Sequence, residues 1–396
     1  MDIVLGIAVT LVVAIAVQLI LVWRKKRMFA KMMHRHLKKG LFSIEEYQEY
    51  ARKRLPRSTF DYFTDGAGNQ STQQDNETAF KRYRLRQRVL KNIAAPDMST
   101  TLLDSHVTLP IGLGPVLRKS WAWPKGDLCS ARAAGEYGIC EIVPCYSEQS
   151  LEEIARVNTE SIKWLQIYLS KQAYHKELIR RAEAAGYKAI VVTVDGHWKR
   201  IVYSDWRNMI FKHMLKTTHG NFNGDNFIKA YSQHVVEHAS WDDIQEVTKI
   251  TNLPIILKGI MEPEDALLAI KYGAKAIIVS NHGGRMMDSL PGALDVLPNI
   301  VKAVNGEIEV YLDGGVRYGG DILKALALGA KACFIGRPLL YGLSYQGEEG
   351  VKQVLNLLKE DLERAMLCTG CKSISQIGPS VISEYQLACC HSNSAD

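Results

Sequence analysis

Outside one short segment, the sequence lacks an excess of charge of either sign. Its 396 residues include 49 Lys or Arg and 42 Asp or Glu, for a formal net charge of +7. Eight of the basic residues fall within residues 24–40, which contain no acid, so the rest of the chain holds 41 basic residues against 42 acidic ones. A neutral body argues against a nucleic-acid-binding surface, and we expect no nucleic-acid partner.

The sequence also lacks a regular framework of cysteines. Its eight cysteines are scattered along the chain. Cys368 and Cys371 have the spacing of a redox or zinc pair, but no second pair matches them, and Cys389 and Cys390 lie in a polar tail. We therefore expect reduced, mostly buried thiols and no metal site.

A third absence concerns the fold. No Gly-x-Gly-x-x-Gly motif follows the first apolar run, which disfavours a doubly wound dinucleotide-binding sheet. The chain instead has eight short apolar runs, most of them followed by a helical pattern. The runs span residues 107–113, 140–144, 162–169, 189–194, 254–258, 274–280, 309–312 and 332–335. This alternation predicts an α/β fold, a (β/α)8 TIM barrel within residues 41–375, with a C-terminal tail at residues 376–396.

Polar and glycine residues collect at the ends of the third to eighth runs. The set comprises Gln166, Tyr168, Thr193, Asp195, Lys258, Ser280, His282, Arg285, Asp313, Gly314, Gly315, Arg317, Gly336 and Arg337. The strands of a parallel barrel end at one rim, so this placement predicts a functional site there. A capped turn or a solvated side chain explains any one of these positions. A core selected for stability alone would not place polar residues at the ends of six consecutive strands.

Two of these groups indicate a chemistry. His282 and Arg285 follow the sixth run, and an imidazole beside a fixed guanidinium suits a base that works on an anionic substrate. A glycine turn with a satisfied His and a surface Arg explains that segment equally well. After the seventh and eighth runs, residues 313–317 and 336–337 offer glycines for close backbone approach and two guanidiniums, which favours a phosphate site over two exposed turns.

Four segments together resemble the FMN-dependent 2-hydroxy-acid oxidase and dehydrogenase family, glycolate oxidase type, over about residues 41–371. They are Ser280-Asn-His-Gly-Gly-Arg285, Leu312-Asp-Gly-Gly-Val-Arg317, the helix at residues 321–329, and Ile335-Gly-Arg-Pro338. The resemblance implies FMN as cofactor and oxidation of a small (S)-2-hydroxy acid to a 2-oxo acid. Because no haem-binding domain precedes the barrel, it favours O2 as acceptor, giving H2O2. It also implies a homotetramer.

The resemblance assigns roles to individual residues. It implies that His282 is the base, that Asp195 pairs with the imidazole, and that Tyr168 lies on the substrate hydroxyl. It implies that Arg285 and Tyr62 hold the substrate carboxylate. The implied cofactor-binding residues are Lys258 at the pyrimidine edge, Gln166, Thr193 and Ser280 at the ring or ribityl chain, and Asp313, Gly314, Gly315, Arg317, Gly336 and Arg337 around the phosphate.

The chain departs from the family pattern at three places. Pro115-Val-Leu117 replaces the family's Pro-Thr-Ala, and Pro144-Cys-Tyr146 replaces its Ser-Ser-Trp. Val202 occupies the position of the second substrate-binding Arg, two residues after Arg200. These changes support an alternative, a membrane-anchored flavin-binding pseudoenzyme that acts as an interaction protein.

The N-terminus carries the longest apolar run. Residues 3–23 contain no charged side chain, which is long enough for a helix that spans a bilayer. The basic residues of 24–40 follow directly. We therefore expect a transmembrane anchor at residues 1–23 and a juxtamembrane linker at 24–40, and the positive-inside rule predicts a single-pass membrane protein with its catalytic domain in the cytosol. The sequence does not indicate which cellular membrane holds the protein.

Overall fold

The computed structural model describes residues 41–157, 161–169, 172–196, 201–214, 216–217, 219–222 and 238–385, together with 17–18, 20–21, 23–24 and 26–27. The chain divides into two compact units, Met1–Glu46 and Tyr47–Asp396. Within the described residues, no helix has both the length and the apolar character needed to cross a membrane. Most of the apolar run at residues 3–23 lies outside them, as do residues 28–40 and 386–396, so the anchor, the linker and the part of the tail after residue 385 stay predictions. Residues 376–385 of the predicted tail are described, and Ile382–Glu384 form a strand.

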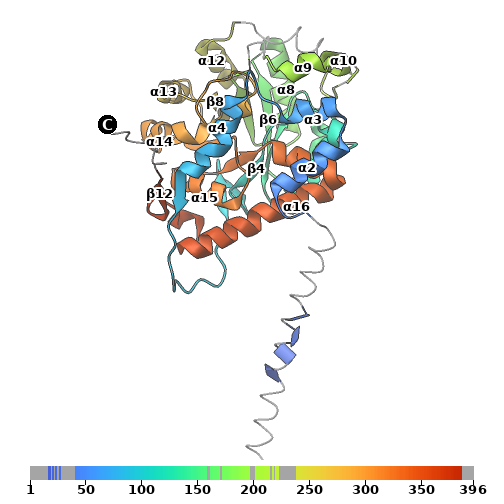
Figure 1. Ribbon diagram of the computed structural model, residues 1–396. Helices are drawn as coiled ribbons and strands as arrows, with labels where there is room; N and C mark the ends of the chain where they lie inside the picture. The colour runs from blue at the N-terminus through green and yellow to red at the C-terminus, as the bar shows by residue number, and fades with distance from the viewer. Residues whose placement is uncertain are drawn as a thin grey trace, which may run out of the picture. The chain divides into compact units, whose positions relative to one another are not determined.

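Eight parallel strands of the second unit close into a barrel, in the order β10-β11-β4-β5-β6-β7-β8-β9 (Figure 1). The strands are β4 (Ile111–Leu113), β5 (Cys140–Pro144), β6 (Lys163–Tyr168), β7 (Ala189–Thr193), β8 (Ile255–Ile260), β9 (Ala276–Val279), β10 (Glu309–Asp313) and β11 (Cys333–Ile335). Each overlaps one of the eight apolar runs, which confirms the predicted barrel. The runs are mostly apolar because strands of a parallel barrel are buried on both faces.

Helices surround the barrel. Those between or after the strands are α5 (Lys119–Ala122), α6 (Gly126–Glu136), α7 (Leu151–Arg156), α8 (Gln172–Ala184), α9 (Tyr203–Arg207), α10 (Ile210–Met214), α12 (Trp241–Ile250), α13 (Pro263–Lys271), α14 (Ala293–Val304), α15 (Gly319–Ala327) and α16 (Arg337–Thr369). Before the first barrel strand come α2 (Ile44–Arg54), α3 (Arg57–Thr64), α4 (Ser71–Ala79), β1 (Tyr83–Leu85), and the hairpin β2 (Thr100–Leu102) and β3 (Ser105–Val107). Strand β12 (Ile382–Glu384) pairs with β1.

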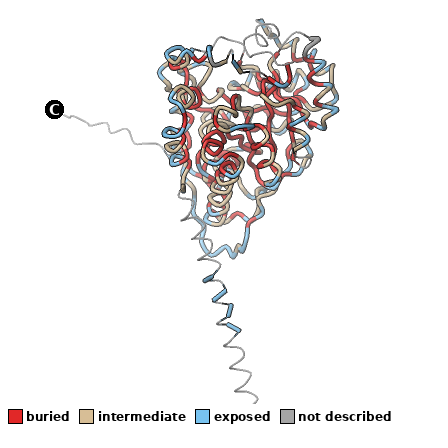
Figure 2. The backbone as a smooth tube through the Cα atoms, turned by 90° about the vertical axis from the view of Figure 1, so that its right-hand side faces the viewer, coloured by how far each residue is buried: buried red, intermediate tan, exposed pale blue. Residues whose placement is uncertain are grey.

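Large side chains fill the barrel interior, so the barrel is a packed core and not a channel. Figure 2 shows that the backbone in the middle of the barrel unit belongs mostly to buried residues. The Trp164 ring lies 5.5 Å from that of Tyr311 and 5.6 Å from that of Phe334 between centroids. Leu102 and Val107 of the β2–β3 hairpin belong to the same cluster. The hairpin thus closes the amino end of the barrel, and the carboxyl end stays available for a site.

A buried ionic cluster joins α5, β5 and α6. Lys119 is 1% exposed, and its Nζ lies 2.8 Å from Glu141 Oε1 and 3.4 Å from Asp127 Oδ1. Ser130 donates its hydroxyl to the same Glu141 oxygen. Burial alone would lower the pKa of Lys119, but the two carboxylates more than offset it and raise that pKa, so the ammonium stays charged.

We expect Lys119→Met to lower the free energy of unfolding by about 3–5 kcal/mol, because two buried carboxylates would lose their counter-ion. The urea midpoint, measured with the slope of the transition, reports this change. Lys249→Met is the control, since Lys249 pairs with Glu246 on the exposed face of α12 and its loss should change little. Equal midpoints for the two variants would contradict this account.

Candidate active site

A cavity of about 470 Å³ opens at the carboxyl ends of the barrel strands. Its wall also includes residues of α3, α9, α10 and the start of α16. Thirteen of the fifteen predicted site residues line it, namely Tyr62, Gln166, Tyr168, Thr193, Lys258, His282, Arg285, Asp313, Gly314, Gly315, Arg317, Gly336 and Arg337. Asp195 and Ser280 lie behind this wall and bond to residues in it. The structure therefore brings together residues that span 276 positions of the sequence, from 62 to 337.

His282 and Asp195 are hydrogen-bonded to each other across the end of β8. His282 Nδ1 lies 2.9 Å from Asp195 Oδ1. Burial would raise the pKa of Asp195, but the adjacent His282 and Lys258 more than offset this and lower it, so the carboxylate stays ionised. Because Asp195 occupies Nδ1, the other ring nitrogen, Nε2, is the one that can exchange a proton with a molecule in the cavity.

A bulge in β8 makes room for this pair. The pairing of β8 with β9 shifts register between Lys258 and Ile260, and Gly259 between them has a φ of +114°. A Cβ on Gly259 would lie 2.7 Å from Cβ of Asp195. Only glycine combines that backbone angle with that clearance, so Gly259 is a site residue that the motif comparison missed.

The turn that carries His282 is held by a reciprocal pair of amides. His282 itself has a φ of +59°, an uncommon conformation for a residue with a side chain. Asn76 of α4 donates to Asn281 Oδ1 at 2.8 Å, and Asn281 donates to Asn76 Oδ1 at 3.0 Å. Asn281 also accepts from the Gly284 amide. Both asparagines are buried, and neither was predicted; an Asn directly after a strand was the available signal for Asn281, whereas Asn76 had none.

Arg285 and Tyr62 lie together in the wall of the cavity. Arg285 Nη1 donates to the Tyr62 carbonyl at 2.8 Å, and the guanidinium carbon lies 5.1 Å from the centre of the Tyr62 ring. Tyr62 is 7% exposed. The sequence alone gave no reason to separate Tyr62 from core aromatics, so only the family resemblance identified it.

Lys258 provides a buried positive charge deep in the site. Its Nζ lies 3.0 Å from Asp313 Oδ2 and donates to Ser280 Oγ at 2.8 Å. Burial would lower the pKa of Lys258, but Asp313 and Asp195 raise it overall, so the ammonium persists. Among the described residues, no group donates to the buried Oδ1 of Asp313. A ligand with both donors and acceptors at one edge would complement these groups.

Gln166 and Tyr168 line the wall nearest β6 and β7. The Gln166 amide donates to Thr193 Oγ1 at 3.1 Å across the two neighbouring strands. The Tyr168 ring packs against Gly196, where a Cβ would overlap the ring. Gly196 therefore fixes how closely Tyr168 approaches the end of β7.

The turn after β10 and the start of α16 form the predicted phosphate corner. Gly314 and Gly315 have φ of +98° and +80°. Arg317 Nη2 lies 2.7 Å from Glu77 Oε1. The Arg337 guanidinium donates to Gly283 O, Phe63 O and Gln73 Oε1 and so joins three elements of the site. The Arg337 side chain is thus already hydrogen-bonded within the protein. The backbone at the amino end of α16, which carries a partial positive charge, is therefore the part of residues 336–337 best suited to bind an anion.

The three departures from the family pattern fall in different places. Pro115, Val116 and Leu117 line the cavity. Tyr146 does not; its ring stacks on Phe222 at 4.8 Å between centroids. Val202 is 1% exposed, so it adds no polar group to the cavity. Arg200 lies outside the described residues.

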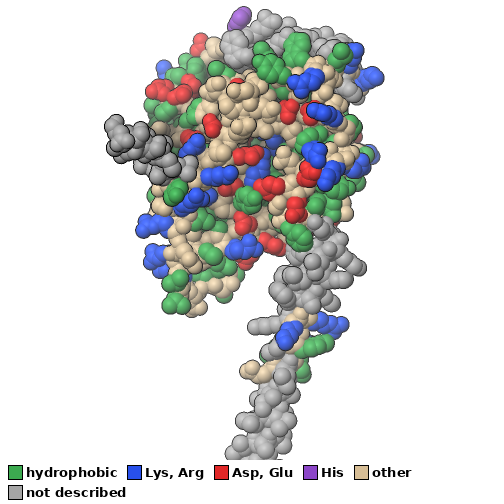
Figure 3. All heavy atoms as spheres, in the orientation of Figure 1, with side chains coloured by type: hydrophobic (Ala, Val, Ile, Leu, Met, Phe, Trp, Pro, Cys, Tyr) green, Lys and Arg blue, Asp and Glu red, His purple; other side chains and the backbone are tan. Residues whose placement is uncertain are grey.

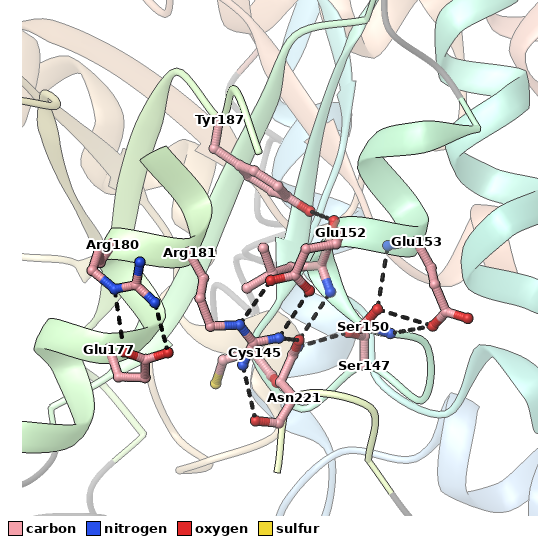
Figure 4. A network of polar contacts seen from close by, with 11 residues as sticks. Cys145, Ser147, Ser150, Glu152, Glu153, Glu177, Arg180, Arg181, Tyr187 and Asn221 are labelled. Atoms are coloured by element: carbon pink, nitrogen blue, oxygen red, sulfur yellow. Dashed lines mark hydrogen bonds and ion pairs between the residues drawn. The ribbon is translucent and has the colours of Figure 1, made fainter. Parts of the chain in front are cut away.

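The segment after β7 supplies part of the wall through Asp205, Ile210 and Met214. Residues 219–222, the later described part of this segment, are held by the polar network shown in Figure 4. The Asn221 amide donates to Cys145 O at 2.9 Å, and its Oδ1 accepts from the Leu151 amide at 2.9 Å. Arg181 donates to Asn221 O and pairs with Glu152 at 2.8 Å. This network ties residues 219–222 to β5, α7 and α8.

Residues 51–384 match the family of FMN-dependent dehydrogenases, and the chain belongs to that family. It is 41% identical to 2-hydroxyacid oxidase 1 of Homo sapiens over 362 residues, covering 88% of this chain and 98% of the relative. It is 39% identical to L-lactate oxidase of Nostoc over 355 residues, covering 86% and 97%. A crystal structure of mandelate oxidase superposes with a TM-score of 0.79 at 36% identity, covering 87% of this chain and 98% of that one.

The cavity fits the FMN that defines the family. Its volume is in the range of small-molecule sites. Lys258, with the unpaired oxygen of Asp313, complements the polar edge of a flavin ring, and the glycine turn with Arg317 and the start of α16 complements a phosphate. FMN is thus the cofactor, and the residue contacts assigned to it stay predictions.

We expect Gly315→Ala to weaken FMN retention, because a methyl group there would overlap the carbonyl oxygen of Asn76 and displace the turn after β10. The ratio of flavin to protein absorbance after gel filtration measures the loss. Gly186→Ala is a matched control, since Gly186 has a similar φ of +81° but no atom within 4 Å of its Cβ position. Full flavin content in Gly315→Ala would contradict the assignment of this turn.

Proposed function

We propose that the protein oxidises an (S)-2-hydroxy acid to the corresponding 2-oxo acid and passes the electrons to O2. The observation that carries this proposal is that His282 lies in the wall of a cavity that fits FMN and is hydrogen-bonded to Asp195 behind that wall. The relatives named 2-hydroxyacid oxidase and L-lactate oxidase support it. The substrate loses two electrons and two protons, and O2 gains both to become H2O2.

His282 is proposed as the base. Nε2 takes a proton from the substrate, and Asp195 stabilises the imidazolium that results. Arg285 holds the substrate carboxylate, and the Tyr62 hydroxyl hydrogen-bonds to it. Tyr168 orients the substrate hydroxyl. FMN, when bound, supplies the acceptor for the two electrons, and Lys258 stabilises negative charge that develops near it.

The pseudoenzyme alternative has weaker support. Its basis is the change at the Pro115, Pro144 and Val202 positions. Val202 is buried and Tyr146 packs into the protein interior, so neither side chain blocks the cavity, although the cation that the family has at position 202 is lost. An idle site has no need to keep a buried ammonium at Lys258 and a buried carboxylate bonded to the ring of His282.

We expect His282→Ala to retain FMN and to slow flavin reduction by about 10²–10⁴-fold, the usual contribution of a general base. Anaerobic stopped-flow bleaching of the full chain with L-lactate, glycolate or a longer 2-hydroxy acid measures the rate. His106→Ala, on the exposed face of β3, is the control. Reduction of His282→Ala at the parent rate would refute the assigned base. A flavin-loaded parent that none of these acids bleaches would favour the pseudoenzyme.

We also propose that residues 1–23 anchor the protein in a membrane, with the catalytic domain on the cytosolic side. Support comes from the uncharged run at residues 3–23 and the basic residues that follow it. Full-length protein should resist extraction by alkaline carbonate, whereas a variant with Leu11→Arg and Ile15→Arg should be released. Release of the full-length protein itself would contradict the anchor. In intact cells, an epitope after residue 385 should be accessible only once the plasma membrane is permeabilised.

A further inference from the structure

A second cavity, of about 620 Å³, lies at the amino ends of β10 and β11. Glu309 and Val310, at the start of β10, lie in its wall, whereas Asp313 at the end of the same strand lines the candidate active site. None of the described residues lines both cavities. The second cavity is therefore a separate site, and the chemistry proposed above does not use it.

The elements around this cavity are held by direct contacts. The Asp97 amide donates to Lys372 O at 2.8 Å, and the Ile374 amide donates to Asp97 O at 3.2 Å. On the other side, a Cβ on Gly329, which follows α15, would lie 2.6 Å from Val301 Cγ1 of α14. Both sides of the cavity are thus fixed by packing, as is usual for a preformed small-molecule site.

Much of the cavity wall is aliphatic. Val304 of α14 and Leu326 of α15 are buried at 1% and 6% exposure. Apolar surface gains free energy when it leaves water, so this wall is suited to the hydrocarbon part of a ligand. The aliphatic residues in the wall are Val301, Val304, Ile308, Val310, Leu326, Ala330, Ile374 and Ile377.

Lys331 brings a positive charge to this wall. Its amide donates to Val310 O at 2.8 Å, so it continues the pairing of β11 with β10. Ala332 and Phe334 belong to the core inside the barrel, and successive side chains of a strand point to opposite faces. The Lys331 side chain therefore points outward, toward the helices. Lys331 is half-buried, and no carboxylate of the described residues pairs with its ammonium.

The acids in the described wall are already bonded within the protein. Asp97 Oδ1 accepts from the Ser99 amide at 2.9 Å, and the hydrogen bonds from Ser99 lower the pKa of Asp97. Glu309 Oε2 accepts from the Leu103 amide at 3.2 Å and from the hydroxyl of Tyr311, which lies inside the barrel. The Glu309 carboxylate thus bonds on the barrel side, away from the aliphatic wall.

The surface charge of the barrel unit does not favour anions in general. Acidic and basic side chains are interspersed on the face shown in Figure 3. A surface of one sign is what would raise the local concentration of every ion of the opposite sign. Selective binding of an anion therefore depends on a particular cation in a particular cavity.

We propose that the second cavity binds a medium-chain aliphatic monocarboxylate. The carboxylate accepts a charge-assisted hydrogen bond from the Lys331 ammonium, and the hydrocarbon chain lies along the aliphatic wall. The hydroxyls of Thr100 and Ser373, in the same wall, can donate to the second carboxylate oxygen. This binding is independent of the proposed oxidation.

The first test asks whether Lys331 recognises the carboxylate. Calorimetric titrations use the full chain in lipid nanodiscs, and a titration into empty nanodiscs is subtracted. The parent should bind octanoate roughly tenfold more tightly than 1-octanol, because a neutral hydroxyl does not replace a carboxylate beside an ammonium. Lys331→Met should lower the affinity for octanoate to that for 1-octanol.

Lys302→Met is the matched control, since Lys302 is exposed on α14 and does not line the cavity. It should keep the preference of the parent for octanoate. An equal preference in the parent and in Lys331→Met, or no saturable binding of either ligand by the parent, would overturn the proposal.

The second test separates this cavity from the catalytic one. Thr101 lies in the wall on the exposed side of β2, where Trp is compatible with a strand. Thr101→Trp should weaken the binding of octanoate and 1-octanol alike and keep the urea midpoint of the parent. The flavin absorbance, which reports occupancy of the catalytic cavity, should respond to octanoate as in the parent. If Thr101→Trp binds octanoate as the parent does, or if the heat of binding only follows the flavin response, octanoate binds elsewhere and the proposal is wrong.

Discussion

The hydrogen bond between His282 and Asp195 depends on a single glycine in the strand that lies between them. Asp195 follows β7 and His282 follows β9, so their side chains must meet across the end of β8. The bulge at Gly259 makes room for the Asp195 side chain, because a side chain at position 259 would overlap it. The positive charge of Lys258, directly before the bulge, helps to lower the pKa of the Asp195 carboxyl group. The chemistry proposed for the site thus requires an irregularity in an otherwise regular barrel.

Most of the barrel and of the cavity wall could be predicted, because both leave local signals. A strand buried on both faces reads as a short apolar run, and a polar residue directly after it is placed at the carboxyl rim by the fold alone. Gly259, Asn76 and Asn281 were not predicted. Their roles depend on which distant segment approaches them, as when Asn76 of α4 meets the turn after β9. The spacing of residues along the sequence does not show which distant segments will contact each other. The residue assignments to substrate and FMN remain predictions.

One departure from the family pattern packs against the long segment after β7. Tyr146, which follows β5, stacks on Phe222 of that segment, and Asn221 bonds to the carbonyl of the neighbouring Cys145. The residues at the end of β5 are therefore held by contacts within the protein. Tyr146 does not line the cavity that His282 faces.

The buried amide pair has a consequence for the biosynthesis of the chain. Asn76-Glu-Thr78 is an acceptor sequence for N-linked glycans. The Asn76 side chain is 2% exposed and bonded to Asn281, and its oxygen also accepts from the Ala293 amide. A sugar attached there during translation would occupy the space of Asn281 and prevent α4 from reaching the barrel. Folding and glycosylation at this position exclude each other.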